Sequence, residues 1–235
     1  TYVEVNKTLT FLADNHFIWN AEKSGYNHLY HYNASGEEVR AITSGDWEVS
    51  SLLGYDEDNR KVYFQAAQPT PMQRHVYVTE LDGGDTKKLS GKSGINEANF
   101  SADYSHMILT SSGMNRPPRT TIRKTNGKVL RKPVTNKALK KRMDQYQFQE
   151  QSFFQFETKD GTSLNGYMLK PADFDDNKEY PVLMRCYGGP GIQTVKHEWG
   201  YFDYIYNQYL AQKGYIVVSI DNRGTGGRGR EVQKM

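Results

Sequence analysis

The stretch "VLMRCYGGPG", residues 182–191, is an apolar run that ends at Tyr187 and breaks at once into Gly-Gly-Pro-Gly. A continuous apolar run of this kind is typical of a strand that is buried on both faces of an α/β sheet. Glycine and proline then let the backbone leave the sheet in a sharp turn without obstruction by Cβ atoms. The sequence therefore predicts that Tyr187 lies at the end of a buried strand, where an α/β sheet exposes side chains to its binding site.

A helix and a second strand are predicted after this first strand. Residues 201–213 read "YFDYIYNQYLAQK", and Gly214 is placed to end the helix that they predict. One stripe of this helix consists of Tyr201, Tyr204, Ile205, Gln208 and Tyr209. Residues 215–221, "YIVVSID", read as a second buried strand. A strand, a helix and a strand in this order imply a parallel pair with a right-handed crossover.

Two further elements are predicted before this unit. Residues 152–171, "SFFQFETKDGTSLNGYMLKP", contain two strands around an Asp-Gly turn at Asp160, which is a strong hairpin signal. Residues 136–149, "NKALKKRMDQYQFQ", have Asn136 as a candidate helix cap and apolar residues at helical spacing. The basic residues of this helix are expected to form a solvated face, with acidic partners as the alternative. They are Lys137, Lys140, Lys141 and Arg142. The predicted order is thus a linking helix, a hairpin and the parallel unit.

The first half of the chain contains a threefold repeat. "NHFIWNAEKSGYNHLYHYNASGEEVRAIT" and "RKVYFQAAQPTPMQRHVYVTELDGGDTKKLS" both read as a strand, a polar turn, a second strand, a Gly-centred turn and a third short strand. His28 corresponds to His75, and Gly36 corresponds to Gly83 by the same shift of 47 positions. "SHMILTSSGMNRPPRTTIRKTNGKVLRKPV" is a third copy, with Gly127 in the place of Gly83. The repeat defines units near residues 1–44, 45–90 and 91–135.

Units of this length with several short strands are typical of β-propeller blades. An array of unrelated hairpins is the alternative. The alternation of residue types supports strands, as in the segment "HLYHY" that begins at His28. Propellers close with about four to eight blades, so three units do not complete a ring. We therefore expect the chain to be a piece of a longer protein.

The composition indicates no special partner. Thirty basic residues against 27 acidic ones give a net charge of +3, too slight an imbalance to indicate a nucleic acid or an anionic membrane. No apolar run approaches the roughly 18 residues of a membrane span, and we expect no signal peptide and no anchor. The six histidines lack acidic or Cys neighbours at ligand spacing, so no metal and no cofactor is expected. The single Cys186 cannot form an internal disulfide, and the compartment stays open.

Four segments carry a family resemblance: "HFIWNAEKSGYNHLYHY", "SFFQFETKDGTSLNGYMLKPADF", "YPVLMRCYGGPG" and "AQKGYIVVSIDNRGTGGRG". In this order they resemble the prolyl oligopeptidase family of serine peptidases, and most closely its dipeptidyl peptidase IV branch. The resemblance implies an eight-bladed β-propeller that caps an α/β-hydrolase domain. It places three blades in residues 1–135, a linker helix in 136–151 and the start of the hydrolase domain in 152–235.

The resemblance also implies an activity and a setting. Members of this branch remove N-terminal dipeptides with Pro or Ala in the second position through an acyl-enzyme, so peptide substrates are expected. They are usually homodimers, and a periplasmic or extracellular location is suggested. A prolyl tripeptidyl peptidase or another oligopeptidase of the family is one alternative. A non-catalytic propeller for protein interaction is another, although it gives no reason for Tyr187 in its setting.

Three residues match family positions near the active site. Tyr187 matches the tyrosine of the oxyanion hole, whose hydroxyl stabilises the charge that develops on the carbonyl oxygen during acyl transfer. Gln193 matches a position that lines the leaving-group side. Arg223, in "DNRGTGGRG", matches a position that organises the loop after the second strand through hydrogen bonds, although a simple Gly-rich turn explains that segment equally well.

The departures from the family pattern are as informative as the matches. No G-x-S-x-G motif occurs in the 235 residues, so the nucleophilic Ser is absent, together with the Asp and His that follow it in this fold. The acidic pair that binds the substrate's amino terminus in this branch is also missing. Glu37 and Glu38 are adjacent, but they stand in a turn beside Gly36 and are expected to be solvated. The chain alone is therefore expected to lack peptidase activity.

Overall fold

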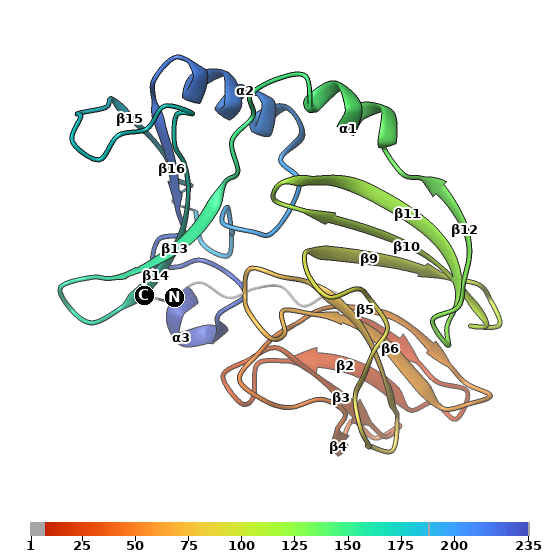
Figure 1. The fold of residues 1–235 in the computed structure, drawn as a ribbon. Coiled ribbons are helices and arrows are strands. Elements are labelled where there is room, and N and C mark those ends of the chain that lie inside the picture. Colours follow the sequence, from red (N-terminus) through yellow and green to blue (C-terminus); the bar gives the residue numbers. More distant parts are fainter. Residues whose placement is uncertain (1–7, 188, 235) are drawn as a thin grey trace.

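Four sheets of four strands each follow one another along the chain in the computed structural model, which describes residues 8–187 and 189–234 (Figure 1). Three of them are antiparallel, and each is built from one continuous segment. The first contains β1 (Leu9–Phe11), β2 (Phe17–Ala21), β3 (His28–Tyr32) and β4 (Glu38–Ala41). The second contains β5 (Val49–Asp56), β6 (Lys61–Ala66), β7 (His75–Glu80) and β8 (Lys87–Lys88). The third contains β9 (Ile95–Phe100), β10 (His106–Gly113), β11 (Arg116–Lys124) and β12 (Val129–Val134).

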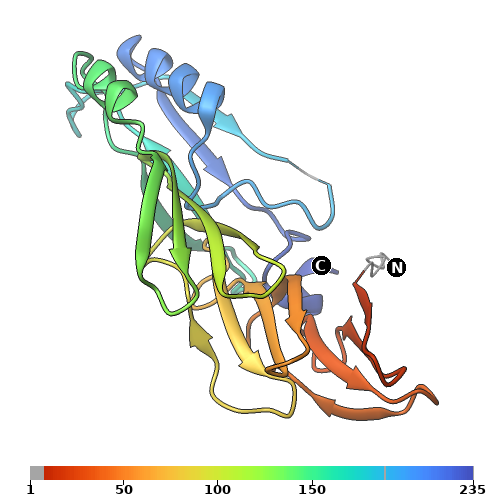
Figure 2. The same cartoon turned by 90° about the vertical axis from the view of Figure 1, so that its right-hand side faces the viewer.

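These four-stranded antiparallel sheets are consistent with the predicted propeller blades. The sequence pattern predicts three strands per unit, whereas each sheet has a fourth, because β1, β5 and β9 precede the repeated segments. The three sheets lie side by side (Figure 2). Ile18 and Leu29 of the first sheet pack with Phe64 of the second in one buried cluster. Tyr63 and Met107 belong to a second cluster, which joins the second sheet to the third.

The repeat reappears as a repeated hydrogen bond. His28 Nδ1 lies 3.0 Å from Thr43 Oγ1, and His75 Nδ1 lies 2.9 Å from Ser90 Oγ. Both histidines are fully buried. All five residues of β3 are buried as well, so the alternation of their residue types does not correspond to an alternation of exposure. A sheet that is covered on both faces removes that distinction.

The fourth sheet is mixed, with the order β13-β14-β16-β15. Its first two strands form the predicted hairpin, in which Gly161 adopts a φ of 82°. A glycine suits this turn because other residues rarely adopt positive φ. The predicted parallel pair is also present, as Val182 aligns with Ile216 and Arg185 with Ser219. The strands are β13 (Ser152–Glu157), β14 (Ser163–Leu169), β15 (Val182–Arg185) and β16 (Ile216–Ile220).

The prediction that the run at Val182 is buried on both faces is wrong. β15 is the edge strand of its sheet, and Val182 and Met184 are 57% and 58% exposed. An apolar run alone does not tell a central strand from an edge strand, because it carries no information about neighbours that lie elsewhere in the sequence.

The two predicted helices are present with changes in extent and orientation. α1 (Lys137–Met143) is shorter than the predicted 136–149. Asn136 precedes it with a left-handed φ of 51° and caps nothing with its side chain, which instead donates to the carbonyl of Pro118 at 2.6 Å. α2 (Tyr201–Gln212) ends before Gly214, as predicted. A short helix, α3 (Gly229–Gln233), lies near the end of the described residues.

The predicted stripe of α2 is only partly the buried one. Tyr204 and Gln208 are buried, but Tyr201, Ile205 and Tyr209 are exposed. The buried face instead includes Asn207 and Ala211: Leu169 and Val217 of the sheet form a core with Ala211. The aromatic residues of this helix therefore leave an uncovered apolar face beside the edge strand.

Loops from all three blades meet the fourth sheet and its loops. The connection between β2 and β3 accepts a hydrogen bond at Gly25 O from Arg230 N, at 2.7 Å. The connection between β6 and β7 accepts one at Met72 O from His197 N, at 2.7 Å. The connection between β10 and β11 contributes Asn115, which exchanges two hydrogen bonds of 3.0 Å with the backbone of Gln151. The equivalent turn of each blade thus bonds to the part of the chain that follows α1.

Among the described residues, no helix is long and apolar enough to cross a membrane.

Candidate functional site

Tyr187 follows the last residue of β15 by two positions and is 53% exposed. Its ring packs closely over Gly189, where a Cβ atom would approach Tyr187 Cε1 to 2.5 Å. Only glycine therefore tolerates the ring in this position. Gly191 adopts a φ of 74°, which also favours glycine. Gly188, the other glycine of the predicted turn, lies outside the described residues.

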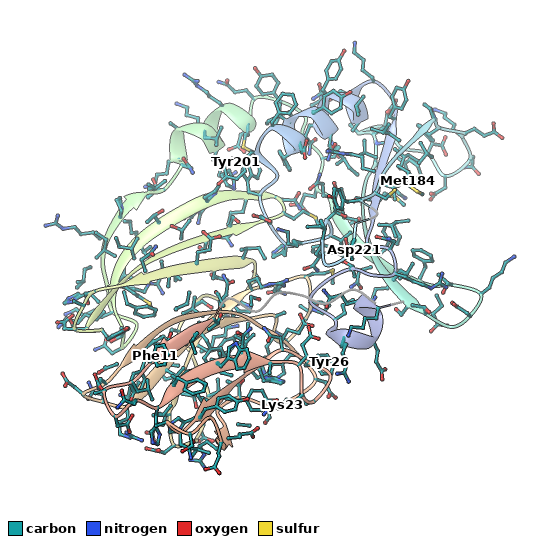
Figure 3. All side chains as sticks on the ribbon, turned by 180° about the vertical axis from the view of Figure 1, so that it is seen from behind. Phe11, Lys23, Tyr26, Met184, Tyr201 and Asp221 are labelled. Atoms are coloured by element: carbon teal, nitrogen blue, oxygen red, sulfur yellow. The ribbon has the colours of Figure 1, made fainter. Side chains whose placement is uncertain are left out.

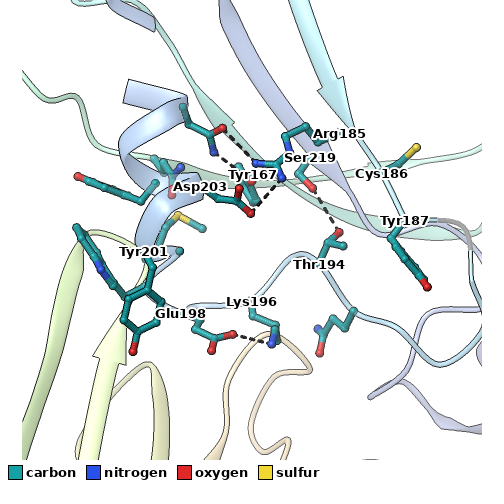
Figure 4. Close-up of a pocket in the computed structure, with 17 residues that line it drawn as sticks. Tyr167, Arg185, Cys186, Tyr187, Thr194, Lys196, Glu198, Tyr201, Asp203 and Ser219 are labelled. Carbon is teal, nitrogen blue, oxygen red and sulfur yellow. Dashed lines mark hydrogen bonds and ion pairs between the residues drawn. The ribbon is translucent and has the colours of Figure 1, made fainter. Parts of the chain in front are cut away.

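Tyr187 borders a cavity of about 440 Å³ between β15, α2 and the loop that joins them (Figure 4). This volume is in the range of sites for small molecules or short peptide segments. The residues that line the cavity are Met114, Gln151, Tyr167, Arg185, Cys186, Tyr187, Gln193, Thr194, Lys196, Glu198, Trp199, Gly200, Tyr201, Asp203, Tyr204, Asn207 and Ser219.

The cavity wall carries charges that are already paired. Arg185 Nη2 lies 3.0 Å from Asp203 Oδ2. Lys196 Nζ lies 2.6 Å from Glu198 Oε2. Both pairs are partly solvated, so each contributes little to stability by itself. They give the cavity a polar wall of balanced charge opposite Tyr187.

The loop between Tyr187 and α2 is fixed by Asp221, the residue that follows β16. Asp221 is 2% exposed and lies in the interior, in the region of the mixed sheet (Figure 3). Its Oδ1 accepts hydrogen bonds from Thr194 N at 2.7 Å, Thr194 Oγ1 at 2.9 Å and Val195 N at 3.0 Å. Its Oδ2 is buried without a hydrogen-bond partner among the described residues. A buried carboxylate with charge-assisted bonds holds this loop more firmly than neutral groups would.

The Gly-rich segment after Asp221 holds the earlier part of the same loop. Gly191 N donates to Gly224 O at 2.8 Å, and Thr225 Oγ1 donates to Ile192 O at 3.0 Å. The backbone is therefore fixed by hydrogen bonds at Gly191 and Ile192, a few residues after Tyr187.

Gln193 borders the cavity, but its amide is engaged with the second blade. Its Oε1 accepts from Arg74 Nη2 at 2.8 Å, and its Nε2 donates to Pro71 O at 2.8 Å and to Val195 O at 3.2 Å. Burial lowers the pKa of Arg74. Arg74 bonds to Pro71 O and Gln73 O as well, so the whole cluster is a fixed joint between blade and loop. The assignment of Gln193 to the leaving-group side stays a prediction.

Arg223 lies apart from the cavity. Its Nη2 donates to Asp160 Oδ2 and, at 3.3 Å, to Thr158 Oγ1, so it ties the Gly-rich segment to the hairpin turn. Hydrogen bonds from Thr158 and Arg223 hold the pKa of Asp160 well below its usual range. These contacts agree with an organising role, and that role too stays a prediction.

The sequence pattern missed two residues of this site. Asp221 stands at the carboxyl end of a predicted strand, as Tyr187 does, and the same argument from the edge of the sheet points to it. Arg74 lies in a blade loop more than a hundred residues away, and nothing in the local sequence indicates its contact with Gln193.

Glu37 and Glu38 are exposed, and Glu38 forms an ion pair with Lys23. The part of the chain that the structure describes contains no group of three His, Cys, Asp or Glu residues that could hold a metal ion.

A family model supplies the comparison that decides the identity. Residues 1–118, half of the chain, match the model of the "Dipeptidyl peptidase IV (DPP IV) N-terminal region". The chain belongs to the dipeptidyl peptidase IV family. This confirms the resemblance that the four sequence segments indicate.

Relatives of known name in the dipeptidyl peptidase IV family extend the match beyond those residues. "Probable dipeptidyl peptidase 4" of Emericella nidulans is 32% identical over 220 residues, which are 92% of this chain and 28% of the relative. "Dipeptidyl peptidase 4" of Trichophyton rubrum is 33% identical over 220 residues, which are 90% of this chain and 28% of the relative. The chain thus spans 28% of the length of these relatives.

A solved structure of a dipeptidyl peptidase 4 gives the same result in three dimensions. The crystal structure of the Porphyromonas gingivalis protein superposes with a TM-score of 0.90 at 38% identity. The superposition covers 96% of this chain and 32% of the crystallised chain. The three blades and the mixed sheet therefore keep the arrangement found in a dipeptidyl peptidase 4.

Proposed function

We propose that the chain is part of a serine exopeptidase that removes dipeptides from the amino terminus of peptides, preferentially after Pro or Ala. The three antiparallel sheets are then blades of a larger, eight-bladed propeller, and the mixed sheet is the start of an α/β-hydrolase domain. The observation that carries the proposal is the placement of Tyr187, which stands at the carboxyl end of a parallel strand, beside a cavity.

Tyr187 has the chemistry and the setting of an oxyanion donor. When a serine attacks an amide carbonyl, the carbonyl oxygen becomes negatively charged, and a fixed hydroxyl donor stabilises that charge more than it stabilises the starting carbonyl. The ring is held over Gly189, and the following loop is anchored by Asp221. This donor therefore requires little reorganisation during the reaction.

The nucleophile and its partners come from elsewhere in a longer polypeptide under this proposal. The 235 residues contain no G-x-S-x-G motif, whereas the relatives are more than three times as long as the matched segment. The chain alone is accordingly inactive. Assembly as a homodimer and a periplasmic or extracellular location are part of the same proposal.

The experiment compares the 235-residue chain with the full-length protein that contains it. The full-length protein is expected to release the chromophore from a Gly-Pro anilide and to react with a fluorophosphonate probe, and the isolated chain is expected to do neither. An N-acetylated Gly-Pro anilide serves as the matched control, because an exopeptidase needs a free amino terminus. Equal cleavage of the acetylated substrate would contradict dipeptidyl specificity, and labelling of the isolated chain would contradict its inactivity.

A further inference from the structure

Positive charge is concentrated in one part of the chain. Residues 104–143 hold eleven Lys and Arg residues and no Asp or Glu. From totals of 30 and 27, the other 195 positions hold nineteen basic and 27 acidic residues. The near-neutral net charge therefore hides a basic third blade and linker helix on an otherwise acidic chain.

Part of this positive charge surrounds a groove between the start of β11 and α1. The groove has a volume of about 380 Å³. Arg116 and Arg119 line it from the blade, and Lys137 and Lys140 line it from the helix. β12 and α1 run along the same margin of the molecule (Figure 1). Every residue of β12 is exposed, and no residue of α1 is buried.

The cations of the groove form few ion pairs, and Arg116 already donates to Ser112 O at 3.2 Å and to Ser93 O and Ser111 Oγ at 3.4 Å. Lys140 pairs with Asp144 at 2.8 Å. Among the described residues, Arg116, Arg119 and Lys137 have no ion-pair partner within 4.0 Å, and Glu150 is the other carboxylate in the lining. Burial lowers the pKa of Arg116, and the neighbouring charge of Arg119 lowers it further. An anion in the groove would relieve this repulsion.

The floor of the groove is apolar. Tyr146 and Phe148 stack on each other with ring centroids 5.5 Å apart, and Phe148 meets Tyr204 edge to face at 6.0 Å. Pro117 and Met143 complete this surface. Because the rings of Tyr146 and Phe148 cover one another, they offer fewer free faces for nucleobases, which bind single-stranded sites by stacking. A ligand that carries both carboxylates and apolar side chains fits the lining better.

We propose that this groove binds an acidic peptide segment, with its carboxylates at Arg119 and Lys137 and its apolar side chains on the aromatic floor. The volume suits a few residues of such a segment. Guanidinium groups bind carboxylates through charge-assisted hydrogen bonds. None of its cations lines the cavity beside Tyr187, and Tyr204 is the residue that borders both sites.

The test measures binding to the full-length protein by fluorescence anisotropy at low and at physiological salt. The probe is a short fluorescein-labelled peptide of alternating Glu and Leu, and the control probe has Gln in place of every Glu. The double variant Arg119→Gln/Lys137→Gln is expected to bind the acidic probe about tenfold more weakly, since it loses two charged contacts. The matched control is Lys128→Gln/Lys132→Gln, which removes equal charge from the same basic segment outside the groove.

The proposal requires saturable binding of the acidic probe, weak binding of the Gln probe and a control variant within about twofold of the unaltered protein. It is overturned if the acidic probe does not bind. It is also overturned if both double variants lose the same affinity, because the probe would then be attracted by the overall positive charge of residues 104–143 and not by the groove. It is also overturned if a labelled single-stranded oligonucleotide binds more tightly than the peptide and is lost with the groove variant. Unfolding midpoints of both variants show whether the fold is kept.

Discussion

Tyr187 and Asp221 show how two residues at one sheet edge take opposite roles. Both follow strands of the parallel pair, yet the tyrosine is half exposed beside the cavity and the aspartate is buried. The difference lies in their partners: the Tyr187 ring rests on Gly189, whereas Asp221 Oδ1 accepts three hydrogen bonds from the loop that begins after Tyr187. One residue is placed to meet a ligand, and the other fixes the backbone that presents it.

Replacement of Asp221 by Ala is predicted to destabilise this part of the protein substantially. Two backbone N–H groups and the Thr194 hydroxyl would lose their shared acceptor, so we expect a loss of about 2–4 kcal/mol in the free energy of unfolding. Urea-induced unfolding measures it. Asp203→Ala is the control, because the solvated pair with Arg185 contributes about 0–1 kcal/mol. Equal effects of the two substitutions would show that Asp221 anchors nothing.

At the scale of the element, the first two blades share one hydrogen-bonding motif. A buried histidine at the start of the third strand bonds to a hydroxyl fifteen positions later, as in His28 with Thr43 and His75 with Ser90. The same hydroxyls also accept from the next backbone N–H, at Leu29 and at Val76. A histidine in this place must be neutral, because burial disfavours its charged form.

Stability is therefore predicted to fall as the pH drops below neutrality. Burial lowers the pKa of His75 to about 4, against an ordinary value of 6.5. Below about pH 6.5 His75 is protonated in the unfolded chain but stays neutral in the folded blade. The free energy of unfolding therefore declines as the pH falls, until about pH 4. We expect on the order of 1–2 kcal/mol from this residue. In His75→Gln, urea unfolding between about pH 7 and pH 5 should show a weaker dependence; an unchanged slope would contradict the assignment.

The sequence predicts most helices and strands correctly, but it does not predict which segments cover each of their faces. The hairpin, the parallel pair and the threefold repeat follow from local periodicity and turn residues, and all are present. The burial of Val182 and the buried face of α2 were predicted wrongly. Both depend on which other segment covers a surface, and a periodic pattern does not carry that information. The joint between Arg74 and Gln193 is hidden for the same reason, since it spans 119 positions.

At the scale of the whole molecule, equivalent blade connections support the sheet that carries Tyr187. Gly25, Met72 and Asn115 each stand between the second and third strands of their blades, and each bonds to the segment after α1. The blades therefore form a platform for the site. Among the described residues β15 has one unpaired edge and an exposed Met184, and exposed aromatic residues of the neighbouring α2 add to this apolar surface.

The isolated 235-residue chain is predicted to self-associate through such open edges. Exposed apolar edge strands pair readily with other chains, and a charged side chain on the edge opposes this. Sedimentation velocity should show oligomers that grow with concentration, and Met184→Lys should shift the distribution towards monomer. Lys159→Met, at the exposed hairpin tip, controls for a general change of surface charge. A monodisperse monomer of the unaltered chain would contradict this prediction.

The central claim is that Tyr187 supplies the hydroxyl of an oxyanion hole, and Tyr187→Phe in the full-length protein tests it most directly. The substitution keeps the ring on Gly189 and removes one donor, which typically costs about 10²–10³ in kcat. Tyr206→Phe removes an exposed hydroxyl of α2 outside this cavity and serves as the control. We predict that kcat for a Gly-Pro anilide falls about 100-fold or more in Tyr187→Phe, with little change in KM, and stays within about twofold in Tyr206→Phe. A kcat that is the same in Tyr187→Phe and in the unaltered protein would contradict the claim.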